Sequence, residues 1–376
     1  MLLRSARARI KDHFSKLTDP RRRPPTYPLI NMVTMLLCGV ISGADDFVAV
    51  ARWARTKRKW LARFLDMSDG VPSHDRFNAV LAAINPREFE QCLLSWITAL
   101  HEITGAQIVA IDGKTLRRSF DAASSKAAIH MVSAWATANH ISLGQVVTDA
   151  KSNEITAIPQ LLRILELSGC LVTIDAMGCQ TQIAADIVAA GADYVLAVKG
   201  NQPTLHNGIR DFFQEHLDDE FARVKVSRHA SEEKGHGREE TRIYYVCPAP
   251  NDLPDGHRWK QLKAIGVTLN ETLRDGKMHA EVRYYILSRK LSARRFAAAV
   301  RGHWGIENQL HWQLDVTFGE DQCRVRKGHA DANLSILRRT ALSLLKNNHT
   351  LSIGVKNKRL AAAWDDDYRQ QVLLGQ

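Results

Sequence analysis

The chain has 376 residues, of which 45% are hydrophobic, and this composition excludes a largely disordered protein. Lysine and arginine outnumber aspartate and glutamate by 51 to 40, and the net charge of +11 indicates a polyanionic partner. Nucleic acid is the first candidate and an anionic membrane surface the second. The six cysteines form no CxxC pair, which argues against a zinc ribbon or a disulfide framework. The most apolar stretch, Leu29 to Ile41, is too short to cross a bilayer. We therefore expect a cytoplasmic protein without membrane contact.

Residues 1–100 are predicted to be helical and basic. The segment from Asp19 to Pro25 should interrupt any helix, because it contains three prolines. Helices are predicted from Met32 to Val40 and from Phe47 to Phe64, and Ser73 is placed to begin another. The pattern fits a small helical bundle with a solvated basic face as well as it fits a DNA-binding region.

From residue 106 the pattern changes to that of an α/β domain with a mixed sheet and flanking helices. A segment rich in predicted strands, at about 221–288, indicates an insertion into that domain, and helices resume after Ser292. The order of the core elements is three strands, a helix, a strand, a helix and a strand. The predicted strands cover 108–111, 129–135, 142–148, 171–174 and 194–198, and the helices cover 156–167 and 181–190.

Two aspartates, Asp112 and Asp175, each follow a short apolar run that reads as a buried strand. Neighbouring carboxylates repel each other, and hard oxygen ligands favour Mg²⁺ or Mn²⁺ as the relieving cation. Glu307, on a predicted helix, is the preferred third acid, and Glu320 is the alternative. Each aspartate alone would more often cap a helix or form a turn, and Glu307 alone could form a surface ion pair. The spacing by itself makes the site plausible and no more.

Around these acids the sequence resembles the transposases of the ISAs1 group, which includes the H-repeat-associated proteins found beside Rhs elements in enteric bacteria. The resemblance covers nearly the whole chain, in several motifs in the same order. The resemblance takes in the N-terminal region from 19 through 75, and the further matching segments are 110–114, 149–155, 173–180, 198–202 and 301–321.

The resemblance implies a DDE transposase with a ribonuclease-H-like core. Asp112, Asp175 and Glu307 would then be the catalytic and metal-binding triad for Mg²⁺, with Mn²⁺ able to substitute. The expected layout is a DNA-binding region over 1–100, a catalytic domain with its β-rich insertion over 101–350, and a C-terminal tail over 351–376. The expected reaction is cleavage of the DNA ends of an insertion element followed by strand transfer into target DNA.

The sequence departs from the wider class at the Tyr-x2-Arg-x3-Glu-x6-Lys signature. Its four positions are occupied by Val300, His303, Glu307 and Leu314, so only the glutamate is kept. Trp304 and Trp312 are candidates to stack on a displaced base, although core packing is the expected role of at least one of them. A zinc site built from the two histidines that flank the glutamate is disfavoured, because no HExxH pattern is present. The residues expected to contact DNA are Lys114, Lys199, Arg301, His303, His311 and Arg324.

The expected partners are double-stranded DNA, as terminal inverted repeats and target, and a second copy of the chain, because two DNA ends must be held together. Association with the bacterial nucleoid follows from that substrate. Two other functions fit the same residues. The chain could be a catalytically silent DNA-binding remnant or regulator derived from a transposase, or a ribonuclease-H-like nuclease or resolvase that cuts without joining.

Overall fold

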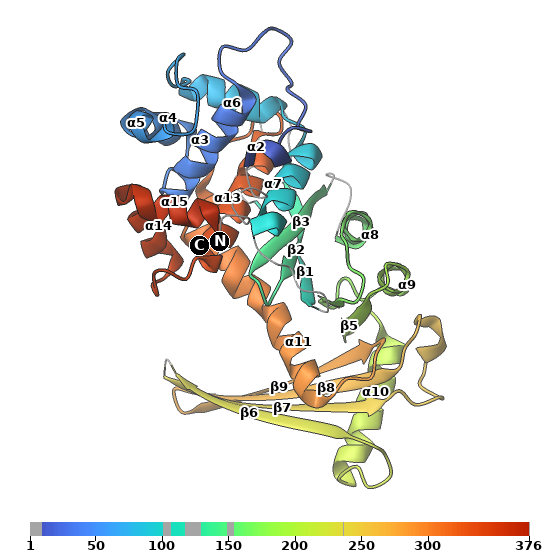
Figure 1. Cartoon of the computed structure of the whole chain (residues 1–376). Helices are drawn as coiled ribbons and strands as arrows, with labels where there is room; N and C mark the ends of the chain where they lie inside the picture. The colour runs from blue at the N-terminus through green and yellow to red at the C-terminus, as the bar shows by residue number, and fades with distance from the viewer. Residues whose placement is uncertain (1–9, 101–106, 117–128, 149–153, 236, 376) are drawn as a thin grey trace.

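A computed structural model describes residues 10–100, 107–116, 129–148, 154–235 and 237–375. Residues 149–153 of the segment shared with the ISAs1 group lie outside these ranges. Within the described ranges, none of the helices has both the length and the apolar character needed to cross a bilayer. Figure 1 shows a helical part that contains the first and the last helices of the described chain, a central sheet, and an arm of long strands beyond it.

The N-terminal region is helical, as predicted. Asp46 and Ser73 cap helices α4 and α6 by accepting the backbone N–H groups of Ala49 and Arg76. The helix expected from Phe47 to Phe64 is instead two helices, because Lys57 leaves helical geometry at φ −96° and ψ 16°. The helices are α2 (Ile10–His13), α3 (Leu29–Ile41), α4 (Phe47–Thr56), α5 (Arg58–Leu61), α6 (His74–Ala83) and α7 (Pro86–Leu100).

The last part of the chain packs against these helices. Helices α13 (Ala330–Asn347), α14 (Val355–Trp364) and α15 (Asp366–Leu374) contribute to the same apolar core as α3, α6 and α7. The side chain of Asn333 donates to the carbonyls of Leu81 and Ile84 at 2.7 and 3.0 Å. On α14, Arg359 donates to the Val40 carbonyl at 2.9 Å. The region 351–376, expected to be a tail, thus contains two packed helices.

The core sheet has the predicted ribonuclease-H-like order, β3-β2-β1-β4-β5. Strands β2 and β3 run antiparallel along one side of β1, and β4 and β5 lie parallel to β1 on its other side. Helices α8 (Glu154–Ile164) and α9 (Thr181–Ala189) cover one face. The strands are β1 (Ile108–Thr115), β2 (His130–Ala136), β3 (Ile141–Thr148), β4 (Leu171–Ile174) and β5 (Asp193–Val198).

The β-rich segment extends this sheet. Strand β9 pairs antiparallel with β5, from Val195↔Leu287 to Val198↔Tyr284, so one sheet of nine strands results. Helix α10 (Pro203–Asp218), which was not predicted, contributes to the core on one face of the added strands, and α11 (Ala293–Ile306) packs on the other. The added strands are β6 (Ser227–Gly235), β7 (Arg238–Pro248), β8 (Ala264–Arg274) and β9 (Lys277–Leu287).

Strand β1 does not end at Asp112, as its apolar run had suggested. Pairing with β4 stops at Ile111↔Ile174, whereas pairing with β2 continues as far as Thr115↔His130. The prediction was wrong because it used hydrophobicity alone, while the hydrogen-bonded neighbour sets the length of a strand. Asp112 therefore lies inside a strand, at the point where one of its two neighbours turns away.

Candidate active site

Asp112 and Asp175 lie toward the same face of the sheet, at the ends of the paired segments of β1 and β4. Ile111 and Ile174 are paired neighbours whose side chains both join the core under α8 and α9. Asp112, which follows Ile111 within β1, points to the opposite face, because successive side chains of a strand alternate. That face is the one on which α11 lies, since Thr173 contacts His303 there. Asp175 comes directly after the last residue of β4 and lines a pocket together with Thr173 and His303.

Glu307 reaches this face from the helix. Helix α11 passes directly into a π-helical turn over Glu307–His311 and then into α12 (Trp312–Val316). Such π turns are rare and often occur at functional sites. Buried Leu310 and Leu314 hold this segment against the helical core.

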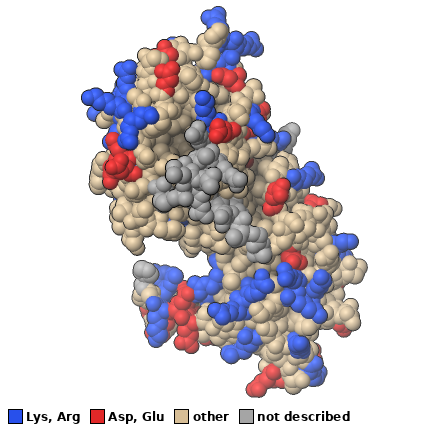
Figure 2. Space-filling model, in the orientation of Figure 1, with Lys and Arg blue, Asp and Glu red and all other residues tan. Residues whose placement is uncertain are grey.

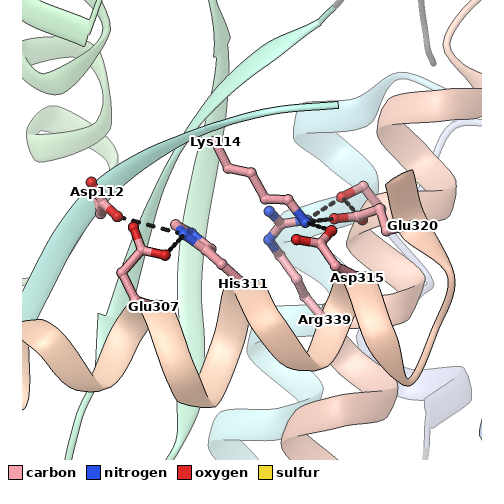
Figure 3. A network of polar contacts seen from close by, with 8 residues as sticks. Asp112, Lys114, Glu307, His311, Asp315, Glu320 and Arg339 are labelled. Carbon is pink, nitrogen blue, oxygen red and sulfur yellow. Dashed lines mark hydrogen bonds and ion pairs between the residues drawn. The ribbon is translucent and has the colours of Figure 1, made fainter. Parts of the chain in front are cut away.

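Two of the three predicted acids converge with a histidine. His311 Nδ1 lies 3.5 Å from Asp112 Oδ2 and 3.7 Å from Glu307 Oε2 (Figure 3). One potential ligand atom from each of these three residues falls within 4.8 Å of the others. His311 is buried and Asp112 is half-buried, whereas the Glu307 side chain is 54% exposed. The cluster therefore opens to the outside on the Glu307 side.

Charge crowding makes this cluster suited to a cation. Burial, together with the neighbouring Glu307 carboxylate, raises the pKa of Asp112 to about 8. The adjacent His311 imidazole lowers the pKa of Glu307, and burial lowers the pKa of His311 itself. A divalent cation would relieve the repulsion between the two carboxylates, and the oxygen and nitrogen atoms present are of the types that bind one.

Asp175 is not one of the three residues whose potential ligand atoms lie close together. Its Oδ1 accepts the backbone N–H groups of Met177 and Gly178 at 3.0 and 3.3 Å, which fixes the carboxylate at the start of the loop after β4. Burial raises the pKa of Asp175. Exposed Lys199 lines the same pocket as Asp175 and His303.

Lys114 does not face solvent, although it was expected to contact DNA. Its ammonium forms an ion pair with Asp315 and a second, at 3.1 Å, with Glu320. Glu320 is 1% exposed and also bonds to Ser335 at 2.7 Å and to Arg339 at 3.5 Å (Figure 3). The network joins β1 to α12 and α13. It also occupies the carboxylate of Glu320, the alternative third acid.

The other expected DNA contacts are dispersed. Arg301 pairs with Glu233 of β6, and Arg324 is exposed. The Nδ1 atom of His303 lies 3.3 Å from Thr173 Oγ1, and burial lowers the pKa of His303 to about 4. His311, only 4% exposed, faces the acids.

The tryptophans named as stacking candidates remain accessible. Trp304 is 42% and Trp312 is 51% exposed. The guanidinium of Arg283 lies 4.1 Å from the centre of the Trp304 ring. Trp304 therefore already has a cationic partner on one side.

Sequence reasoning missed a fourth carboxylate. Glu154, the first residue of α8, bonds through Oε1 to His130 Nε2 at 3.0 Å, and its charge contributes to the raised pKa of both Asp112 and Asp175. Gly113 lies beneath this pair, and an added Cβ there would overlap Glu154 and lie 2.7 Å from His130 Nε2, so these side chains would have to shift. The available signal was the position of Glu154 in the segment 149–155, to which no role had been given.

The chain matches transposase family models and transposases of known sequence over nearly its full length. Residues 103–344 match the family model "Transposase DDE domain", and residues 11–97 match the model "DDE_Tnp_1-associated". The H repeat-associated putative transposase YhhI of Escherichia coli (strain K12) is 38% identical over 373 residues, 98% of each chain. The putative transposase YncI of Escherichia coli O157:H7 is 41% identical over 367 residues, 96% of this chain and 93% of that one.

A solved structure of a piggyBac transposase synaptic complex with hairpin DNA aligns with 98% of this chain and 81% of that chain. The TM-score is 0.43 and the sequence identity 9%, a likeness too weak to support conclusions about this chain. The family assignment depends on the sequence matches, which span nearly the full length of the chain and of its relatives. The chain belongs to the DDE transposase family, whose members cut DNA and transfer its strands.

Proposed function

We propose that Asp112, Asp175 and Glu307 hold divalent metal, Mg²⁺ or Mn²⁺, and catalyse both cleavage of element ends and their transfer into target DNA. The observation that carries this proposal is the convergence of Asp112 and Glu307 on the sheet face to which Asp175 also points. A divalent metal bound there would activate the attacking oxygen and stabilise the leaving one.

The side chains around the acids have distinct parts in this proposal. The amides of Met177 and Gly178 keep the Asp175 carboxylate in one orientation before DNA arrives. Glu307 is open to solvent, so a phosphate can approach it without rearrangement of the helix. Lys199 lies beside Asp175, where its ammonium would bind a phosphate next to the one that reacts.

DNA binding would use the basic surfaces on either side of the site. Figure 2 shows lysine and arginine side chains on the N-terminal helical part and on the lobe built from β6 to β9. Strand β1, which carries Asp112, lies between these parts in Figure 1. We propose that 1–100 binds element ends, that Arg301 and Arg324 contact DNA near the catalytic domain, and that two copies act together. The substrate would place the protein at the nucleoid.

A cleavage assay tests the proposal. The full chain is incubated with Mg²⁺ or Mn²⁺ and a labelled duplex carrying the terminal repeats that flank its own gene. Asp175→Asn keeps an oxygen for the Met177 and Gly178 amides but lacks the charge, so it should bind the ends without cutting them. Asp186→Asn on α9, where the acid is bonded to Gln182, is the matched control and should cut like the wild type.

The products separate the competing functions. Joined strands identify a transposase, nicks alone identify a nuclease or resolvase, and shifted but uncut DNA identifies a silent binding protein. Equal cutting by Asp175→Asn and the wild type would show that the proposed triad is wrong.

A further inference from the structure

His311 lies at the centre of the acidic cluster, yet three carboxylates alone would leave it without a role. It comes from the last position of the π turn that begins with Glu307, and its ring is directed between Asp112 and Glu307 (Figure 3). It is 4% exposed, so contact with DNA would require it to leave its place. Burial of a histidine between two acids calls for a specific explanation.

The contacts of His311 are not those of a satisfied core histidine. Its Nε2 is buried, and among the described parts of the chain it has no hydrogen-bond partner. Its Nδ1 lies 3.5 and 3.7 Å from the two carboxylate oxygens, longer than an ordinary N–H···O bond. The imidazole is thus held near both acids without a normal hydrogen bond to either.

These distances fit three ligands of one ion. Ligand atoms that each lie about 2.1 Å from one ion are about 3.0 Å apart at adjacent octahedral positions and about 4.2 Å apart at opposite ones. The distances of 3.5 and 3.7 Å from His311 Nδ1 fall between these limits. One potential ligand atom from each of the three residues lies within 4.8 Å of the other two. Only small side-chain movements would be needed to close the set on a metal.

We propose that His311 Nδ1 is a nitrogen ligand, beside Asp112 and Glu307, to one divalent ion of the site. The inference rests on the proposed function and deepens it, because it sets the metal preference. Imidazole suits transition metals, whereas Mg²⁺ is bound through oxygen. His311 therefore shifts the preference of this position from Mg²⁺ toward Mn²⁺ and Co²⁺.

Pulsed electron paramagnetic resonance on the full chain loaded with Mn²⁺ tests the nitrogen directly. The wild type should show the hyperfine coupling of a bound imidazole nitrogen. His311→Gln should bind Mn²⁺ about tenfold or more weakly and lose that coupling, while its affinity for Mg²⁺ changes less. His303→Gln is the matched control, because His303 lies four residues before Glu307 but contacts Thr173, and this variant should retain the coupling.

The possible results separate this inference from the proposed function. Mn²⁺ bound to the wild type without nitrogen coupling, or coupling that survives in His311→Gln, would overturn the role of His311. If either result were found while Asp112→Asn lost Mn²⁺ binding, the proposed carboxylate metal site would remain supported and only the role of His311 would be wrong. Equal Mn²⁺ binding by Asp112→Asn and the wild type, or none by the wild type, would overturn both.

Discussion

Replacing Lys114 by methionine separates a structural role from a DNA-binding one. The ammonium is buried against Asp315 and Glu320, so the structure assigns it to the junction of β1 with the C-terminal helices. Methionine preserves most of the length of the side chain and removes the charge. We expect Lys114→Met to lower the free energy of unfolding and to change the salt dependence of DNA binding little.

The expected loss of unfolding free energy can be worked out from the pKa of Glu320, the buried partner of Lys114. Burial alone would raise its pKa, but Arg339 and then Lys114 bring the pKa down from 4.5 to about 2. A shift of that size corresponds to about 3 kcal/mol of stability for the charged form. Removal of one partner from a buried ion pair typically costs about 3–5 kcal/mol. Because Arg339 remains in place, we expect a loss at the lower end, about 3 kcal/mol near neutral pH.

Urea denaturation of the metal-free chain measures this loss. The stabilisation from Glu320 is complete above its unfolded pKa and disappears as the pH falls toward its folded pKa. The difference between Lys114→Met and the wild type should therefore shrink below about pH 4.5. Glu320→Gln, alone and combined with Lys114→Met, completes a double-mutant cycle. An unchanged urea midpoint, with a salt slope of DNA binding reduced by about one, would refute the structural role.

Three further results are expected. Gly113→Ala should slow cleavage at least about tenfold without loss of DNA binding, because the added Cβ displaces the Glu154 side chain. Gly200→Ala is the control and should cut at the wild-type rate, because the space around Gly200 is open, and single-turnover cleavage rates test both variants. The pKa of Asp112 is about 8 in the folded chain and about 4 in the unfolded chain, so protonation of Asp112 stabilises the fold below about pH 8. The melting temperature of the metal-free chain should therefore be lower at about pH 9 than at about pH 6, and added Mn²⁺ should reverse this order. Lys199→Ala should reduce the salt slope of DNA binding by about one, and an unchanged slope would place its ammonium away from DNA.

The strands of the core could be predicted because they are short apolar runs with clear boundaries. Strand β4 was predicted with its correct ends, since Gly169 precedes the run and Asp175 follows it. The join between β5 and β9 has no comparable local signal. Pairing between strands so distant in the chain depends on how the intervening helix and hairpins pack, which the apolar pattern does not record.

The site was predicted in part. The family resemblance indicated Asp112 and Glu307, and the structure brings them together with His311. The burial of Lys114 could not be predicted, because a lysine at the end of an apolar run is usually solvated. Its two acidic partners, Asp315 and Glu320, are distant from it in the sequence. The π turn at Glu307 likewise results from packing of the whole helix.

The common core of the first and last helices has a consequence for synthesis of the protein. Helix α3 is apolar almost all round, and α13, which packs against it, begins at Ala330, 289 residues after Ile41. At about 5–20 residues per second, a ribosome needs roughly a quarter of a minute to a minute to make that stretch. During this time α3 lacks its final cover and is open to chaperones or to aggregation. The helical part can therefore mature only after α13 has been made.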